Sequence, residues 1–107
     1  MKKLVSIVLF VWVFCSASFT QCCTFTLSMF DSFGDGWNGG SLTVNVAGTN
    51  FGPYSASGSG SQSTFTACPG DLITLTYSSG AWEGENTYSL LDPNGTVLFS
   101  DGPNPTT

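Results

Sequence analysis

The segment Thr24-Phe25-Thr26-Leu27-Ser28-Met29 leads into Asp31-Ser-Phe-Gly-Asp-Gly-Trp-Asn-Gly-Gly40, and together these two stretches decide the predicted fold. Polar and apolar residues alternate in the first stretch with a period of two, which is the pattern of a half-buried β-strand. The second stretch is rich in glycine and contains two carboxylates and a side-chain amide. We therefore expect a strand that ends in a loop rich in oxygen ligands.

The same alternation recurs along the chain, and no helical periodicity appears after residue 20. Turn signals such as Ala47-Gly48-Thr49-Asn50 and Asp92-Pro93-Asn94-Gly95 separate the runs. Residues 52–63, rich in Gly and Ser, are predicted to be a long, mobile loop. Short strands at this spacing predict an all-β fold, a small antiparallel β-sandwich of the jelly-roll or CUB-like type. The predicted strands are residues 24–29, 41–46, 64–67, 73–78, 87–90 and 97–99.

The N-terminal segment carries the signals of secretion. Met1-Lys2-Lys3 is followed by an apolar run over residues 4–14 and by small residues at 16–18. This pattern predicts a secretory signal peptide over residues 1–20, with an uncleaved anchor as the alternative. The apolar run is short for a membrane span. We expect residues 21–107 to form a single extracellular domain with no membrane segment in the mature form.

The charge distribution excludes several classes of function. Lys2 and Lys3 are the only basic residues, so residues 21–107 contain all seven acidic side chains and no Lys, Arg or His. Such a domain cannot neutralise nucleic-acid phosphates, and it lacks the usual general base and cationic stabilisers of an enzyme. The sequence therefore predicts a non-catalytic protein whose surface attracts cations rather than nucleic acids.

Cys22, Cys23 and Cys68 follow the predicted signal peptide, and a secreted context favours disulfides. We expect Cys23 to bond with Cys68, because Cys23 begins the first strand-like run. The bond would close a loop of about 46 residues and contribute about 4 kcal/mol of stability. Cys22 would then be free or would form an intermolecular disulfide.

The loop at residues 31–40 has part of the pattern of an EF-hand calcium loop. With Asp31 as position one, Asp35 and Gly36 fall at positions five and six, as that loop requires. Phe33 and Leu42, however, stand where oxygen ligands belong. Because strands rather than helices flank the loop, it is not an EF-hand, and it needs ligands from elsewhere in the chain.

The segment Trp82-Glu83-Gly84-Glu85-Asn86 is the expected source of the missing ligands. Calcium takes six to eight oxygens from carboxylates, side-chain amides and backbone carbonyls. The predicted calcium ligands are Asp31, Asp35, Asn38, Glu83 and Glu85, with one of the two glutamates supplying the third carboxylate. The alternative is a glycine-rich turn that Asp31 caps through its own side chain without a metal, with the tryptophans in the core.

The strand faces predicted to meet solvent consist of Thr and Ser with scarcely a charge. Three interpretations are open. Thr simply suits exposed strand positions, or the faces carry O-linked sugars, or they pack against neighbouring copies. Asn94-Gly95-Thr96 is in addition an N-glycosylation acceptor on a predicted turn. The candidates for stacking on sugar rings are Trp37, Trp82, Tyr54 and Tyr88.

The stretch Asp31-Ser-Phe-Gly-Asp-Gly-Trp-Asn-Gly39, preceded by Cys23-Thr-Phe-Thr-Leu and followed by Trp82-Glu-Gly-Glu-Asn-Thr-Tyr88, resembles the "DSYGDGWNG" β-sandwich modules of bacterial and protist extracellular proteins. The resemblance covers about residues 23–102. It implies an extracellular, non-catalytic module with adhesive, matrix or surface-structure roles. The matching motif positions are Asp31, Asp35, Trp37, Asn38, Glu85 and Tyr88.

The sequence thus favours a structural or adhesive subunit of an extracellular assembly, such as a filament, hair or coat. The expected partners are further copies of the chain or other extracellular subunits. A single copy of the motif in the chain fits a small subunit that functions as many copies in one assembly. A calcium-dependent carbohydrate-binding module is the alternative function, with glycans as its partners.

Overall fold

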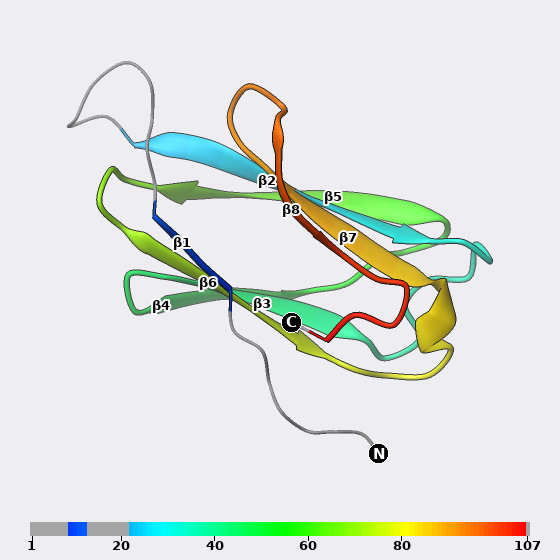
Figure 1. Ribbon diagram of the computed structural model, residues 1–107. Helices are drawn as coiled ribbons and strands as arrows, with labels where there is room; N and C mark the ends of the chain where they lie inside the picture. The colour runs from blue at the N-terminus through cyan, green and yellow to red at the C-terminus, as the bar shows by residue number, and fades with distance from the viewer. Residues whose placement is uncertain (1–8, 13–21, 107) are drawn as a thin grey trace.

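The computed structural model describes residues 9–12 and 22–106, and its two antiparallel sheets confirm the predicted β-sandwich (Figure 1). One sheet has the strand order β1-β6-β3-β4 and the other has the order β5-β2-β7-β8. Among the described residues, no helix is long and apolar enough to cross a membrane. The elements are β1 (Leu9–Trp12), β2 (Cys23–Asp31), β3 (Ser41–Val46), β4 (Thr49–Tyr54), β5 (Gly60–Ala67), β6 (Leu72–Ser78), the 3-10 helix η1 (Glu83–Glu85), β7 (Asn86–Leu91) and β8 (Val97–Asp101).

The core lies between the two sheets and is built by the alternation seen in the sequence. Every second residue of the central strands points inward, because successive side chains of a strand face opposite sides of the sheet. In β2 these residues are Phe25, Leu27 and Met29, all buried. The opposite sheet contributes the buried residues Leu42, Val44, Val46, Ile73 and Leu75.

An aromatic cluster closes one end of this core. Trp37, from the loop after β2, is fully buried, and its indole Nε1 donates a hydrogen bond to the Phe30 carbonyl at 2.9 Å. Its ring meets the Tyr77 ring edge-on, with centroids 5.4 Å apart, and Tyr77 stacks on Tyr88. Burial raises the pKa of both tyrosine hydroxyls above the ordinary value of 10.0. Trp37 is therefore a core residue that belongs to the loop.

The prediction of a mobile loop over residues 52–63 was wrong. β4 and β5 occupy most of this stretch and leave only residues 55–59 as their connection. β4 lies at the edge of its sheet and is mostly exposed. Only Phe51 and Tyr54 are partly buried against the core, so burial imposes no period-two alternation on its sequence. An edge strand also tolerates the Gly52-Pro53 pair, since proline's missing N–H can face solvent.

The disulfide joins Cys22 to Cys68, not Cys23 to Cys68 as predicted. The reason is strand register. Cys23 pairs with Ala67 in the antiparallel β2–β5 ladder, so Cys22 and Cys68 stand opposite each other one step beyond it. Cys22 therefore has no sulfur left for an intermolecular bond, and Cys23 is not a free thiol either.

The predicted signal peptide lies mostly outside the described residues. Its residues 9–12 form β1, which pairs antiparallel with β6 so that Leu9 stands opposite Leu75 and Trp12 opposite Leu72. Cleavage after residue 20 stays a prediction.

Trp37→Ala is expected to lower the free energy of unfolding by about 3–5 kcal/mol, because it empties a fully buried site in the core. The matched control is Trp82→Ala, which removes a side chain that is 67% exposed, and we expect its effect to stay within about 0.5 kcal/mol. Urea denaturation followed by circular dichroism measures both. Equal losses in the two variants would contradict the placement of Trp37 in the core.

Candidate metal centre

The loop after β2 is organised around the carboxylate of Asp31, the last residue of that strand. Asp31 is only 2% exposed. Its Oδ2 accepts hydrogen bonds from the backbone N–H groups of Gly34 at 3.0 Å and of Asp35 and Gly36 at 2.7 Å. The N–H of Phe33 lies 3.4 Å from Oδ1, which makes a weaker fourth contact. Asp31 therefore caps its own loop, as the alternative interpretation of the sequence expected.

The segment of η1 lies against this loop, as the sequence predicted, and Figure 1 shows both at the same end of the sandwich. The backbone N–H of Ser32 donates to the Glu85 carbonyl at 2.9 Å. In the β2–β7 ladder, Asp31 stands opposite Asn86, the residue after Glu85. Two loops that are about 50 residues apart in sequence are thus fixed side by side through their backbones.

Three carboxylates meet where the loops touch. One oxygen from each of Asp31, Asp35 and Glu85 lies within 4.8 Å of the other two. Calcium–oxygen bonds of 2.3–2.6 Å allow two ligands of one ion to lie at most about 5 Å apart. The spacing therefore fits a hard divalent cation, and Glu85 rather than Glu83 supplies the third carboxylate of the cluster.

The electrostatics of the cluster are unbalanced. Burial, then the carboxylates of Asp31 and Asp35, raise the pKa of Glu85 above 4.5. Burial alone would raise the pKa of Asp31 too. The hydrogen bonds that its carboxylate makes with the Asp35 side chain and with the loop N–H groups outweigh burial and lower that pKa below 3.8. The Oε1 atom of Glu85 is buried and has no hydrogen-bond partner among the described residues. A buried carboxylate oxygen without a partner is costly, so the site has an unmet demand for positive charge.

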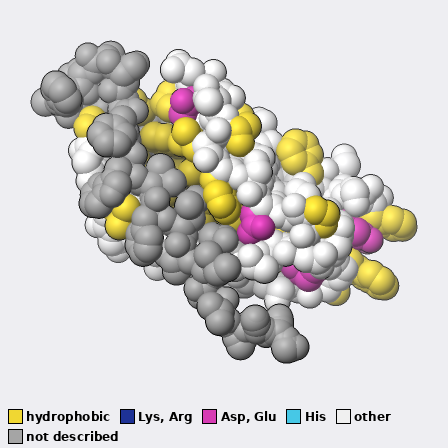
Figure 2. Space-filling view, viewed as in Figure 1, with side chains coloured by type: hydrophobic (Ala, Val, Ile, Leu, Met, Phe, Trp, Pro, Cys, Tyr) yellow, Lys and Arg dark blue, Asp and Glu magenta, His cyan; other side chains and the backbone are white. Residues whose placement is uncertain are grey.

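Within residues 9–12 and 22–106, no basic side chain is present to meet this demand. The only basic residues in the sequence are Lys2 and Lys3. Figure 2 shows acidic side chains on the visible face, with no Lys, Arg or His side chain among the described residues there.

Two of the five predicted ligands, Asn38 and Glu83, make local hydrogen bonds, and their part in binding a metal stays a prediction. Asn38 uses its amide nitrogen to donate to Asp35 Oδ1 at 3.2 Å and to the Gly36 carbonyl at 3.0 Å, so it orients the loop. Glu83 accepts a hydrogen bond from the Gly80 N–H through Oε2 at 2.6 Å. Its Oε1 is buried without a partner among the described residues, as that of Glu85 is, but Glu83 lies outside the three-carboxylate cluster. The sequence did not indicate these interactions, because both depend on turns that bring the two ends of a short segment together.

Buried polar groups behind the loop were missed by the sequence analysis. Asn86 is fully buried, and its Nδ2 donates to the Tyr77 hydroxyl at 2.8 Å, while its Oδ1 has no partner among the described residues. Gly40 makes room for this pair, since a Cβ there would lie 3.2 Å from Asn86 Nδ2. Tyr77 fitted the apolar alternation of its strand, so no signal in the sequence marked it as a polar partner.

The predicted sugar-stacking residues separate into two groups. Trp37 and Tyr88 are buried in the core, so no ring face is open to a ligand, and this part of the prediction was wrong. Trp82 is exposed and Tyr54 is partly buried. Asn94 is exposed on the turn between β7 and β8, where its N–H donates to Asp92 Oδ1 at 2.8 Å. Its glycosylation stays a prediction.

No protein-family model, no curated protein and no solved structure matches this chain. The resemblance to the "DSYGDGWNG" modules therefore rests on the quoted motif residues alone and stays a prediction.

Glu85→Gln is expected to raise the melting temperature at neutral pH in the presence of chelator, because it removes a charge that Asp31 and Asp35 repel. Wild-type protein in chelator should likewise gain stability as the pH falls from neutrality toward 4.5, the ordinary pKa of a glutamate. The sign follows from the raised pKa of Glu85, since the folded state then binds the proton more tightly than the unfolded state. Further acidification should destabilise the protein, because the pKa of Asp31 is lowered on folding.

Thermal melts of both proteins across this pH range, monitored by circular dichroism, provide the measurement. In Glu85→Gln the gain on mild acidification should be absent or much reduced. A stability of the wild type that rises steadily with pH up to neutrality would contradict the unbalanced charge at Glu85.

Proposed function

We propose that this chain is a secreted, non-catalytic β-sandwich that serves as a structural or adhesive subunit of an extracellular assembly. We further propose that a calcium ion bound by Asp31, Asp35 and Glu85 ties its two end loops together. The observation that carries the proposal is the buried, unpartnered Oε1 of Glu85 beside two other carboxylates, in a chain that has no basic residue after Lys3.

Calcium suits the ligands of this site better than zinc does. The three groups are hard oxygen ligands, and no His is present in the sequence to favour zinc. Asp35 is exposed, so it leaves the ion accessible to water, which commonly completes a calcium shell. The ion would join Asp35 of one loop to Glu85 of the other and would remove the repulsion between them.

The composition of the site supports a role without catalysis. Asp31 is already committed to the N–H groups of its own loop, which leaves it unable to act as a free acid or base. The chain offers no His, and no Lys or Arg after residue 3, to stabilise a developing anion. A carboxylate cluster in this setting is best suited to holding an ion.

The outer face of the sheet β1-β6-β3-β4 supports a role in an assembly. The side chains paired across the outer face of β3 and β6 include Thr43 with Thr76 and Asn45 with Thr74. Such faces lack the Lys and Glu that usually keep sheets apart in soluble proteins. Any joining of subunits would rest on these surfaces and not on Cys22, whose sulfur is bonded to Cys68.

Calcium-dependent carbohydrate binding remains the second candidate at this end of the molecule. It is favoured by Trp82, which is exposed and lies three residues before Glu85 on the same short turn. An aromatic ring beside an ion is a suitable platform for a sugar whose hydroxyls complete the ion's shell.

Calcium at about 1 mM is expected to stabilise the wild type by about 1.4 kcal/mol relative to chelator, if the dissociation constant is about 0.1 mM. For a domain of this size that corresponds to a rise in melting temperature of roughly 6–11 °C. Glu85→Gln should abolish the rise. Glu83→Gln is the matched control and should retain it, because Glu83 lies outside the cluster. If the wild type has the same melting temperature with calcium and with chelator, the proposed calcium ion is contradicted.

Purified protein in calcium is expected to form filaments or ordered arrays at high concentration, visible by negative-stain electron microscopy. Because Cys22 is bonded within the chain, these assemblies should run as monomers on denaturing gels without reductant. Sedimentation velocity that shows only monomer at every soluble concentration would count against a subunit role, whatever the outcome for calcium.

A further inference from the structure

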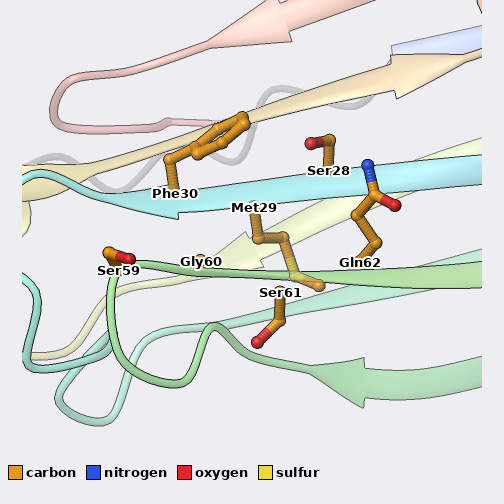
Figure 3. Close-up of a pocket in the computed structure, with 7 residues that line it drawn as sticks. All are labelled: Ser28, Met29, Phe30, Ser59, Gly60, Ser61 and Gln62. Carbon is orange, nitrogen blue, oxygen red and sulfur yellow. The ribbon is translucent and has the colours of Figure 1, made fainter.

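The outer face of the sheet β5-β2-β7-β8 carries an open groove of about 550 Å³ beside Phe30 (Figure 3). Its lining residues come from β2, from the start of β5 and from Ser59 just before it. Figure 3 shows Phe30, Ser28 and Gln62 standing on one side of the sheet, while Met29 and Ser61 point to the other side. The groove follows the β2–β5 pair, and none of its lining residues belongs to the carboxylate cluster.

Phe30 provides an exposed aromatic platform in this groove. Its side chain is 51% exposed, although the residue belongs to a central strand. Gly60 pairs with it on β5, and a Cβ there would lie 3.3 Å from Phe30 Cδ1, so the glycine gives the ring room to lie over the neighbouring strand. The Phe30 carbonyl accepts the Trp37 indole hydrogen bond, which anchors its backbone to the core.

A row of neutral polar side chains crosses all four strands next to this ring. The strand registers place Gln62, Ser28, Ser89 and Ser100 side by side. Ser89 and Ser100 share a hydrogen bond of 2.8 Å between their hydroxyls. Ser28 is only 6% exposed, so its hydroxyl forms part of the floor of the groove. At about 4.8 Å between strands the row is roughly 14 Å long, which suits a chain of sugars better than a single ring.

The chemistry of the face identifies its ligand. The residues that flank the ring and the row are Thr24, Thr26, Thr64, Thr66, Thr87 and Leu91, and none is charged. A protein partner would call for a cluster of large apolar or aromatic residues. On this face such residues stand apart, because Leu91 and Val97 lie on the side of the polar row opposite to Phe30. The immediate surroundings of the Phe30 ring are hydroxyls and an amide. A sugar presents an apolar C–H face for a ring and a rim of hydroxyls for polar groups. An anionic polysaccharide is disfavoured by a chain with seven acidic residues and no basic residue after Lys3.

We propose that this face binds a neutral polysaccharide, with one sugar ring stacked on Phe30 and adjacent hydroxyls bonded to Gln62 and Ser89. The binding uses no metal and is independent of the proposed calcium ion. It gives the secreted module a direct means of attachment to a polysaccharide wall or matrix.

The test is binding of the purified full chain to cellulose, chitin, mannan, starch and β-1,3-glucan, by pull-down for insoluble forms and affinity electrophoresis for soluble ones. We expect at least one of these to retain the wild type equally in calcium and in chelator. Phe30→Ala should weaken retention by about tenfold or more, as loss of a central aromatic contact does. Phe30→Tyr keeps the ring and should preserve binding.

Phe33→Ala is the matched control, because it removes the same side chain from a residue that is 75% exposed beside the carboxylate cluster. It should leave retention unchanged. Three outcomes would overturn the proposal: no retention of folded wild type on any of the five polysaccharides, retention that Phe30→Ala does not weaken, or retention that chelator and Trp82→Ala abolish. The last outcome would assign sugar binding to the calcium end instead, and circular dichroism of each variant excludes loss of folding as the cause.

Discussion

The bonds between the Asp31 carboxylate and the N–H groups of its own loop hold one end of this molecule in shape. The loop contains closely spaced glycines with positive φ, at Gly34 and Gly36, and such backbone has no hydrogen-bond partners from regular structure. A single carboxylate oxygen accepts hydrogen bonds from the N–H groups of Gly34, Asp35 and Gly36, the last of which it shares with the Gly58 carbonyl. Buried N–H groups without partners are costly, so the fold at this end depends on an anion at position 31.

That anion also connects the polar end of the sandwich to its apolar core. The N–H of Gly36 donates to the Gly58 carbonyl and the N–H of Trp37 to the Ala56 carbonyl, which attaches the loop to the β4–β5 connection. Trp37 then enters the core directly behind the loop, against Tyr77. The arrangement is unfavourable for Glu85. It places this carboxylate beside Asp31 and Asp35 and leaves its buried Oε1 without a hydrogen-bond partner among the described residues. The geometry of this one loop therefore determines both the packing of Trp37 in the core and the clustering of carboxylates that attracts a cation.

The alternating pattern was sufficient to predict the central strands, because each has one buried and one exposed face. It failed at β4, which is an edge strand with little buried surface, and it could not choose between Cys22 and Cys23, since that choice depends on a register fixed by the whole β2–β5 ladder. Residue chemistry alone also predicted the meeting of Asp31, Asp35 and a glutamate.

The exposure of the aromatic side chains was the property hardest to predict from the sequence. Trp37 and Tyr88 have the chemistry of a sugar platform, yet both lie inside the core, whereas Phe30 stands outside at a position where an ordinary strand would carry Thr or Ser. The difference depends on which aromatic side chains point toward the opposite sheet and which point toward solvent. That cannot be read from a short window of sequence when aromatic residues occur on both faces of the same region.

β1 gives the predicted leader of this chain a structural role of its own. Leu9–Trp12 covers the free side of β6, so the sheet β1-β6-β3-β4 has β6 in its interior. Cleavage after residue 20 would remove β1 and leave the backbone groups of Leu72, Ile73, Thr74 and Leu75 at an open edge. No Lys, Glu or Pro stands in β6 to discourage pairing with another strand there. Maturation would then also change the sheet itself, because the cut would turn β6 from an interior strand into an edge strand.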